Sequence, residues 1–353
     1  MSENQGTKIQ EREEVKKDRI KAGEFYRIRP DGRWEIYLDA TMAGTFGVCE
    51  MMYLESFVNR LTPKGDRPFA RDLGSWWSAV MESIYTADFN SKRLDSKQII
   101  DMSMEVWNKL QMDELEKYHP RSYKEFGGRY GALQMIAEYA SRQLPIDYQT
   151  WKIVAAEASF GRDREVCIGE TERIILYWMG QPDLFVISGE RLFPVDHKSI
   201  AYIDANTSKK YKPHIQVPGY IVAGQVLCKS LGYDLPVDRA VINCVARSDR
   251  TDKSGESKHP RFKRISVSYT PAELDEWRAR RLAQAERVRY CFETSTWAWN
   301  EYSCANIWNK PCQFQNIHEK PPDVRQVVIN ADYIKRDFWI PGRSKDETEA
   351  KGE

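Results

Sequence analysis

The sequence has no apolar run close to the roughly 20 residues that a membrane-spanning helix requires. Its first residues, SENQGTKIQEREEVKKDRIK, are charged throughout and lack the apolar core of a secretory signal. The net charge is only +1, so any nucleic-acid-binding surface must be a local basic patch. No internal repeat and no G-x-x-x-x-G-K-[ST] phosphate-binding loop occur, so any nucleotide-driven motor must lie on another chain.

Cysteine is present in an odd number, seven, without a secretory signal. We therefore expect a reducing, cytoplasmic setting, where clustered cysteines more often bind metal than form disulfides. The 353 residues, 41% hydrophobic, are enough for a large core of one or two domains. We expect one integrated domain over 23–340 between charged tails. Its expected parts are a mainly helical part (23–150), a catalytic sheet core (151–270) and a C-terminal helix with a cysteine segment (271–340), with tails at 1–22 and 341–353.

The stretch 174–200 predicts a β-hairpin. Two apolar runs, Ile174–Ile187 and Leu192–Val195, flank the residues Ser-Gly-Glu-Arg. Glycine in the first place of a two-residue loop favours a type II′ turn. If Gly189 and Glu190 form that loop, the numbers of paired residues sum to 379.

This register places charged residues together. Asp183 then faces Asp196, and Gln181 faces Lys198, while Asp196 and Lys198 share a face because they are two residues apart. Opposed like charges destabilise a sheet, and two close carboxylates either share a proton or recruit a cation. Solvated salt bridges on an edge hairpin are the alternative, but the apolar neighbours favour a built site.

The expected chemistry follows from the donor types. Carboxylate oxygens suit Mg²⁺ or Mn²⁺. A lysine beside such an ion could orient or deprotonate a metal-bound water, which suits phosphodiester hydrolysis.

Periodicity and turn residues predict the other elements. Expected strands cover Phe25–Ile28, Trp34–Leu38, Ile153–Phe160, Ala240–Ala246 and Phe262–Tyr269. Expected helices cover a segment capped by Thr41, then Leu73–Tyr85, most of Lys92–Gln143, and a segment from the capping box at Thr270 to about Cys291.

The charged motifs resemble those of the PD-(D/E)XK nuclease superfamily. They are Gly180-x-x-Asp183 and Asp196-x-Lys198, followed by Gln216-x-x-x-Tyr220, which is similar to a motif of the RecB-like branch. The resemblance implies an α/β fold with a restriction-endonuclease-like core, a central mixed sheet flanked by helices, and an α-rich N-terminal part.

The resemblance also implies an activity and roles. The expected protein is a Mg²⁺-dependent deoxyribonuclease, an exonuclease or flap-type enzyme acting on single-stranded DNA or free ends. By analogy it would serve recombination, repair or replication, with a helicase or recombination partner on another chain. The expected roles are metal binding by Asp183, Asp196 and the backbone carbonyl of His197, water positioning by Lys198, and substrate orientation by Gln216 and Tyr220.

Two glutamates are further candidates. In the RecB-like branch a Gly-x-x-x-His-x-x-x-Glu helix often feeds the metal site. Here the match runs from Gly74 to Glu82, with Ser78 in place of histidine. Glu82 is then either a catalytic residue or an ordinary surface residue. Glu157, expected in the first core strand, is either a metal ligand or a structural partner.

Cysteines near both ends resemble the iron–sulfur ligands of a subset that includes AddB and CRISPR-associated exonucleases. The matching residues are Cys49, Cys304 and Cys312, with His318 where the subset has cysteine. Imidazole ligates iron in some clusters, and Cys291 is the other candidate. A Cys₃His zinc site and unligated core cysteines are the alternatives to a [4Fe-4S] cluster.

The segment Arg247–Arg264 is basic, with seven Arg or Lys residues against three acidic ones. Such a loop could neutralise DNA phosphates. The alternative to an active nuclease is a catalytically idle DNA-binding or assembly subunit with a structural iron–sulfur or zinc site, which Ser78 and His318 favour. A zinc protein that binds no DNA is a third possibility.

Overall fold

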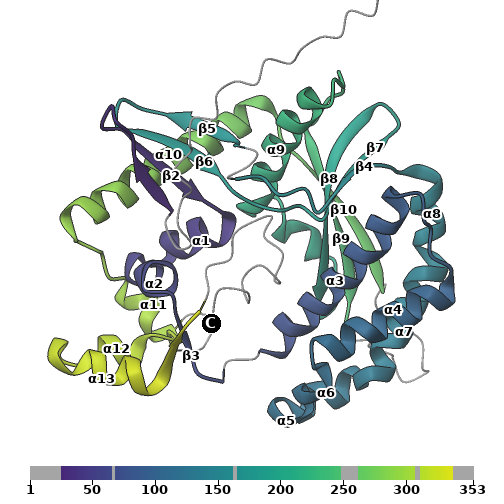
Figure 1. The fold of residues 1–353 in the computed structure, drawn as a ribbon, viewed down its shortest axis with the longest axis horizontal. Helices are drawn as coiled ribbons and strands as arrows, with labels where there is room; N and C mark the ends of the chain where they lie inside the picture. The colour runs from purple at the N-terminus through teal and green to yellow at the C-terminus, as the bar shows by residue number, and fades with distance from the viewer. Residues whose placement is uncertain (1–24, 66–67, 162–164, 248–260, 307–310, 337–353) are drawn as a thin grey trace, which may run out of the picture.

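The structure is a computed structural model that describes residues 25–65, 68–161, 165–247, 261–306 and 311–336 (Figure 1). The expected tails at 1–22 and 341–353, and most of the basic segment Arg247–Arg264, lie outside these residues. No described helix combines the length and apolarity needed to cross a bilayer. That residues 23–340 form a single domain stays a prediction.

A five-stranded mixed sheet forms the centre of the molecule, in the order β10-β9-β8-β7-β4. The β8–β9 pair is parallel, and the pairs β10–β9, β7–β8 and β4–β7 are antiparallel. The strands are β4 (Lys152–Ala156), β7 (Leu184–Ser188), β8 (Arg191–Ile200), β9 (Arg239–Ala246) and β10 (Phe262–Ser268). Helices flank both faces of this sheet, so the prediction of a mixed α/β fold is confirmed.

Two smaller sheets complete the strands. A four-stranded sheet has the order β1-β2-β6-β5, and a two-stranded sheet pairs β11 with β3. Their strands are β1 (Tyr26–Ile28), β2 (Trp34–Leu38), β3 (Leu61–Pro63), β5 (Cys167–Glu170), β6 (Ile174–Trp178) and β11 (Tyr333–Lys335). The pairing of β11 with β3 joins the C-terminal end of the described chain to residues near the start of the helical part.

Thirteen α-helices occur in the described residues. They are α1 (Ala40–Val48), α2 (Glu50–Tyr53), α3 (Phe69–Phe89), α4 (Ser96–Lys109), α5 (Leu115–Tyr118), α6 (Pro120–Phe126), α7 (Gly128–Arg142), α8 (Leu144–Thr150), α9 (Gln216–Ser230), α10 (Pro271–Thr294), α11 (Glu301–Asn306), α12 (Gln315–His318) and α13 (Pro322–Asp332). Three other helical turns are a π-helix at Leu54–Val58 and 3₁₀ turns at Met112–Glu114 and Thr207–Lys210.

The central sheet buries an apolar layer on each face because side chains alternate along a strand. Leu184, Val186 and Val195 pack in one cluster with α3, α4 and α7. Phe185 and Leu192 pack in the other cluster with α9 and α10. Figure 1 shows α3, α4 and α7 on one side of this sheet and α9 on the other.

The predicted hairpin register is confirmed. Leu184 pairs with Val195 and Ser188 with Arg191, so paired numbers sum to 379. The pairing ends at Leu184 and Val195, so the expected pairs Asp183–Asp196 and Gln181–Lys198 lie beyond the ladder. Gly189 has a φ of 59°, which glycine adopts without steric cost. The longer strand expected over Ile174–Ile187 is wrong, because Ile174–Trp178 pairs in parallel with β2 in the other sheet.

The structure corrects the predicted boundaries of two helices. Asp39, not Thr41, caps α1, since its carboxylate accepts a hydrogen bond from the Met42 N–H at 2.7 Å. The predicted capping box at Thr270 is confirmed, and α10 continues to Thr294 rather than ending near Cys291.

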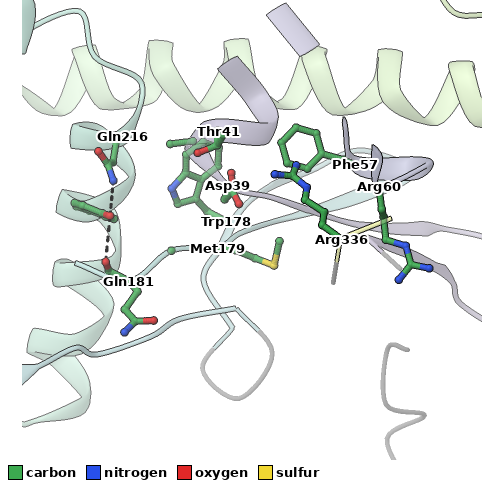
Figure 2. A pocket seen from close by; sticks show the side chains of 12 residues that line it. Asp39, Thr41, Phe57, Arg60, Trp178, Met179, Gln181, Gln216 and Arg336 are labelled. Carbon is green, nitrogen blue, oxygen red and sulfur yellow. Dashed lines mark hydrogen bonds between the residues drawn. The ribbon is translucent and has the colours of Figure 1, made fainter. Parts of the chain in front are cut away.

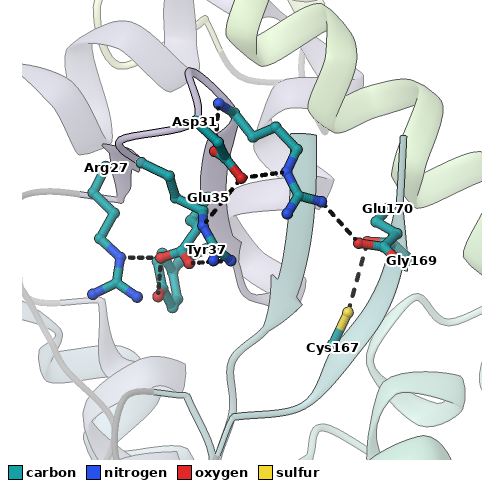
Figure 3. A network of polar contacts seen from close by, with 9 residues as sticks. Arg27, Asp31, Glu35, Tyr37, Cys167, Gly169 and Glu170 are labelled. Carbon is teal, nitrogen blue, oxygen red and sulfur yellow. Dashed lines mark hydrogen bonds and ion pairs between the residues drawn. The ribbon is translucent and has the colours of Figure 1, made fainter. Parts of the chain in front are cut away.

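Ion pairs link the strands of the four-stranded sheet (Figure 3). Glu35, almost fully buried, pairs with Arg27 and accepts a hydrogen bond from the Tyr37 hydroxyl at 3.2 Å. Arg33 reaches Glu170 of β5 at 3.2 Å. The buried carboxylate is thus paired, as an interior charge must be.

Helix α9 lies against β6 at Gly219, where a side chain has no room. A Cβ atom there would lie 2.0 Å from Nε1 of Trp178, whose ring packs edge-on against Trp277 at 4.9 Å. The indole cannot move aside, so glycine sets how closely the helix approaches the sheet.

We predict that Gly219→Ala lowers the free energy of unfolding by about 1–3 kcal/mol, the usual range for overpacking a core. Gly44→Ala in α1 is the matched control, since a Cβ there meets nothing within 4 Å. That control should be neutral or slightly stabilising, because alanine favours helix. Urea denaturation measures both, and equal midpoints for the two variants would contradict the packing argument.

Candidate active site

Asp183 and Asp196 lie close together just beyond the paired part of the β7–β8 hairpin. Asp196 is on β8 and buried, and Asp183 immediately precedes β7 and is partly buried. The carboxylate of Asp183 accepts a hydrogen bond from the backbone N–H of His197, the residue after Asp196. Burial and the negative charge of Asp196 raise the pKa of Asp183, so the two carboxylates repel each other.

Lys198 lies beside this pair. Its Nζ is 2.9 Å from Oδ1 and 2.8 Å from Oδ2 of Asp196. Burial alone would lower the pKa of Lys198, but the charges of Asp196 and Asp183 raise it above its ordinary value. The side chain is therefore an ammonium ion at neutral pH, suited to hold and orient a polar group rather than to accept a proton.

Glu157 joins the site through a strained backbone. The prediction placed it within a strand, but β4 ends at Ala156 and Glu157 has a φ of 48°, the left-handed region. Its N–H donates to the Asp183 carbonyl at 2.9 Å, which holds this conformation. Burial and the charges of Asp183 and Glu82 raise the pKa of Glu157 to about 8. Strain of this kind is concentrated at functional sites.

Glu82 occupies an exposed position on α3, yet its charge acts on the site. It raises the pKa of both Glu157 and Asp183. Ser78 is partly buried one turn earlier on the same helix. The structure thus places Glu82 at the rim of the carboxylate group, in accord with either role expected for it.

Gln216 and Tyr220 extend the site from α9. They lie one turn apart, and the Gln216 amide donates to the Tyr220 hydroxyl at 2.5 Å. That hydroxyl donates to the Gln181 carbonyl at 3.2 Å, and the Gln181 amide donates to the Glu157 carboxylate. A continuous chain of hydrogen bonds therefore connects the start of α9 to the carboxylates.

The donor set suits a hard cation. Mg²⁺ keeps several waters and is usually held by one or two carboxylates, which Asp183 and Asp196 provide. The backbone carbonyl of His197, the residue after Asp196, is the third oxygen expected from the sequence. Within the described residues no group of three or more His, Cys, Asp or Glu side chains is already spaced around a metal position. The raised carboxylate pKa values are nevertheless what a bound cation would relieve.

The side chain of His197 points to the opposite face of β8. Its Nδ1 lies 2.9 Å from the Asn243 amide, which donates to the Tyr139 hydroxyl at 2.6 Å. The imidazole also stacks on Tyr85, with centroids 5.2 Å apart. Burial and the charges of Arg264 and Lys198 lower the pKa of His197 to about 3, so the ring is neutral.

This buried network extends to Asp147 and was not predicted. The Tyr85 hydroxyl donates to the Asp147 carboxylate at 2.6 Å, and Arg264 pairs with the same carboxylate. Its members come from α3, α7, α8, β8, β9 and β10. Nothing in their spacing along the sequence indicates that they meet. The network anchors β8 directly behind the two carboxylates.

The expected cluster residues at the two ends converge only in part. Cys49, Cys304 and Cys312 are buried, and burial together with Cys304 and Cys49 raises the pKa of the Cys312 thiol. The Trp299 indole donates to the Cys304 sulfur at 2.5 Å and packs on the His318 ring at 5.2 Å. The His318 ring is buried, and its Nε2 lies 3.5 Å from a carboxylate oxygen of the buried Glu55.

Cys291 lies apart from these residues. Its thiol on α10 is 3.4 Å from a carboxylate oxygen of Glu50, and it packs in the main core. Burial and Glu50 raise the pKa of Cys291 to about 12. This location favours His318 over Cys291 as the fourth member of the group.

The family model described as the PD-(D/E)XK nuclease superfamily matches residues 40–317. The chain therefore belongs to the PD-(D/E)XK nuclease superfamily, and its mixed sheet flanked by helices is consistent with a restriction-endonuclease-like fold.

Similarity to individual proteins is low. No curated protein matches the sequence. The chain is similar to a Eubacterium rectale protein of known crystal structure named "Putative exonuclease", with 13% identity and a TM-score of 0.40. The match covers 81% of this chain and 94% of that chain.

We predict a pH-dependent stability for the metal-free protein. The pKa values of Asp183 and Glu157 are higher in the folded than in the unfolded protein. The folded protein is therefore most stable when both carboxyls are protonated, and it loses stability as pH rises from about 4 through about 8. The melting temperature in EDTA should therefore fall between about pH 5 and pH 9. Asp183→Asn should reduce this fall.

Mg²⁺ should raise the melting temperature of the wild type at high pH, by mass action, and not that of Asp183→Asn. Asp275→Asn, at an exposed position of α10, is the control and should behave as wild type. An Asp183→Asn profile that follows the wild type would show that this carboxyl does not titrate abnormally.

Proposed function

We propose that this protein is a Mg²⁺-dependent deoxyribonuclease that removes nucleotides from DNA ends. The observation that supports it best is the convergence of Asp183, Asp196 and Lys198 just beyond the paired part of the β7–β8 hairpin. Membership of the nuclease superfamily supports the reaction class.

In this proposal Asp183, Asp196 and the His197 carbonyl would hold the cation. When bound, Mg²⁺ would lower the pKa of an attacking water and neutralise charge on the scissile phosphate. Lys198 would orient that water through its ammonium group, and Glu157 or Glu82 would add a ligand or a proton acceptor.

Gln216 and Tyr220 would orient the substrate. Their hydrogen-bond chain ends on Glu157, so a phosphodiester that contacts the start of α9 lies next to the carboxylates. Positioning of this kind contributes strongly to phosphoryl chemistry, which depends on alignment more than on covalent participation.

Replacing Lys198 tests the catalytic role. We predict that Lys198→Ala lowers the cleavage rate by about 10²–10⁴-fold, the usual range for losing a group that assists proton transfer. DNA binding should survive. Lys229→Ala, an exposed lysine in the last turn of α9, is the matched control. Degradation of end-labelled single- and double-stranded DNA with Mg²⁺ or Mn²⁺ measures both variants.

An unchanged rate in Lys198→Ala would remove the proposed role of that residue. Wild-type protein that binds DNA but never cleaves it would support the alternative, an idle DNA-binding or assembly subunit, which the serine at position 78 favours. Comparison of end-blocked circular DNA with linear DNA separates exonuclease from endonuclease action.

We also propose that Cys49, Cys304, Cys312 and His318 bind an iron–sulfur cluster, with zinc as the alternative. The buried thiols of Cys304 and Cys312, with Cys49 near enough to raise the pKa of Cys312, support this assignment. A ligated group would fix the C-terminal segment to the N-terminal helices, in addition to the β3–β11 pairing.

We predict that anaerobically purified protein is brown and contains iron and acid-labile sulfide. His318→Cys should retain the colour, whereas Cys312→Ser should lose it, because thiolates are the usual ligands of such clusters. Cys228→Ser, at a buried cysteine of α9 in the main core, is the control. Colourless protein with stoichiometric zinc would replace iron by zinc, and metal-free protein would show plain core cysteines.

A further inference from the structure

A cavity of about 300 Å³ is lined at one end by Gln181 and Gln216, which belong to the candidate site (Figure 2). The side chains that line it and carry the argument are Phe57, Arg60, Met179, Gln181, Tyr220 and Arg336. Its volume lies at the small end of the range for small-molecule sites, which corresponds to a ligand of nucleotide size. None of the roles assigned above uses the part of this cavity that lies away from α9.

One end of the cavity belongs to the proposed active site. Gln216, Tyr220 and Gln181 line it there, and the Gln181 amide contacts the Glu157 carboxylate. The charges of Asp196 and Asp183 contribute to raising the pKa of Tyr220 after burial, so the tyrosine lies near both carboxylates. A strand that occupies the cavity would therefore continue directly onto the metal-binding residues.

The other end holds two arginines. Figure 2 shows Arg60 and Arg336 together there, across the cavity from Gln216 and Gln181. The Arg336 N–H donates to the Arg60 carbonyl at 2.9 Å, so the two residues are tied together. Arg336 also donates to the Ser56 carbonyl at 3.0 Å and lies over Phe57. Within the described part of the chain, neither guanidinium forms an ion pair with a carboxylate.

Arg60 keeps its side chain in an unfavourable backbone conformation. Its φ is 59°, at the residue after the C-cap of the π-helix, where glycine is the preferred residue. An arginine at this place incurs a conformational cost that glycine would avoid. A ligand bound by the guanidinium would explain why arginine rather than glycine occupies this backbone conformation.

One acid also lines the cavity, Asp39, but its oxygens are engaged. Its carboxylate caps α1 through the Met42 N–H, burial raises its pKa, and its charge also acts on Arg336. Between the two ends the lining includes the apolar Met179, and Phe57 lies at the arginine end beneath Arg336. Aromatic and apolar surfaces accept any base by stacking, and arginines bind phosphate.

We propose that this cavity holds one nucleotide of a DNA single strand next to the scissile phosphate, with the adjacent phosphate bound by Arg60 and Arg336. The proposal rests on the proposed nuclease function and adds to it a sequence-tolerant subsite for a single strand. A duplex cannot enter, because a paired base would need room for its partner.

The test measures binding without cleavage. Fluorescence anisotropy of a labelled oligothymidylate in EDTA gives the dissociation constant and its salt dependence. The variants are Arg60→Gly, Arg336→Gln and the double variant. Arg121→Gln is the matched control, since Arg121 is exposed on α6 and pairs with Glu125. Melting temperatures are measured in parallel.

The double variant should bind more weakly, and its plot of log K against log salt should be shallower by about 0.7, the value for one single-strand phosphate contact. Arg121→Gln should retain the wild-type slope. Arg60→Gly is informative because its backbone fits glycine, so we expect an unchanged or higher melting temperature together with weaker binding. Arg60→Lys, which retains the charge, should recover most of the slope.

A wild-type slope and affinity in the double variant would overturn the proposal. Thymidine monophosphate should compete with the oligonucleotide for wild-type protein and much less for the double variant. Equal competition by inorganic phosphate would overturn the nucleotide assignment, because phosphate alone would then occupy the site.

Binding is read without metal, so the two proposals can fail separately. If the wild type cleaves DNA but the arginine variants bind DNA as tightly as it does, the subsite proposal alone is overturned. If the arginine variants bind DNA more weakly but the wild type never cleaves it, the subsite is supported and the nuclease proposal is overturned. If the double variant shows the same decrease in salt dependence with a duplex oligonucleotide, the single-strand assignment is contradicted.

Discussion

Repulsion between carboxylates held on one hairpin is the constraint on which the site depends. Asp183 and Asp196 are brought together by the β7–β8 register, and burial removes the water that would screen them. The ammonium of Lys198 offsets only part of this charge, so the arrangement is costly without a cation. A fold tolerates such a cost where the chemistry requires it, and the same groups that destabilise the metal-free protein are those expected to bind the metal.

The rest of the fold opposes that repulsion. On the far face of β8, His197, Tyr85, Tyr139 and Asn243 form a buried network that fixes the strand directly behind the carboxylates. Each donor and acceptor in such a network specifies the position of its neighbours more sharply than apolar contacts do. On the near face, α9 packs against the central sheet, and its Gly219 lets it approach Trp178 of β6 closely. The site is therefore held from both sides of one strand.

The sequence by itself determined the local features of the site. Period-two alternation and one glycine specified the hairpin and its register over Leu184–Val195, which leaves Asp183 and Asp196 close together just beyond the paired residues. Helical spacing likewise placed Gln216 beside Tyr220. These predictions succeeded because each depends on residues close in the chain, whose geometry follows from backbone periodicity alone.

Only the tertiary structure decided how distant segments meet. It divided the apolar run at Ile174–Ile187 between two sheets, moved Glu157 out of its strand into a left-handed conformation, and joined Arg60 to Arg336 across the chain ends. Such contacts depend on long-range packing, which can override local propensity and leaves no periodic trace in the sequence. For that reason the carboxylate pair could be predicted, whereas the arginine-lined cavity beside it could not.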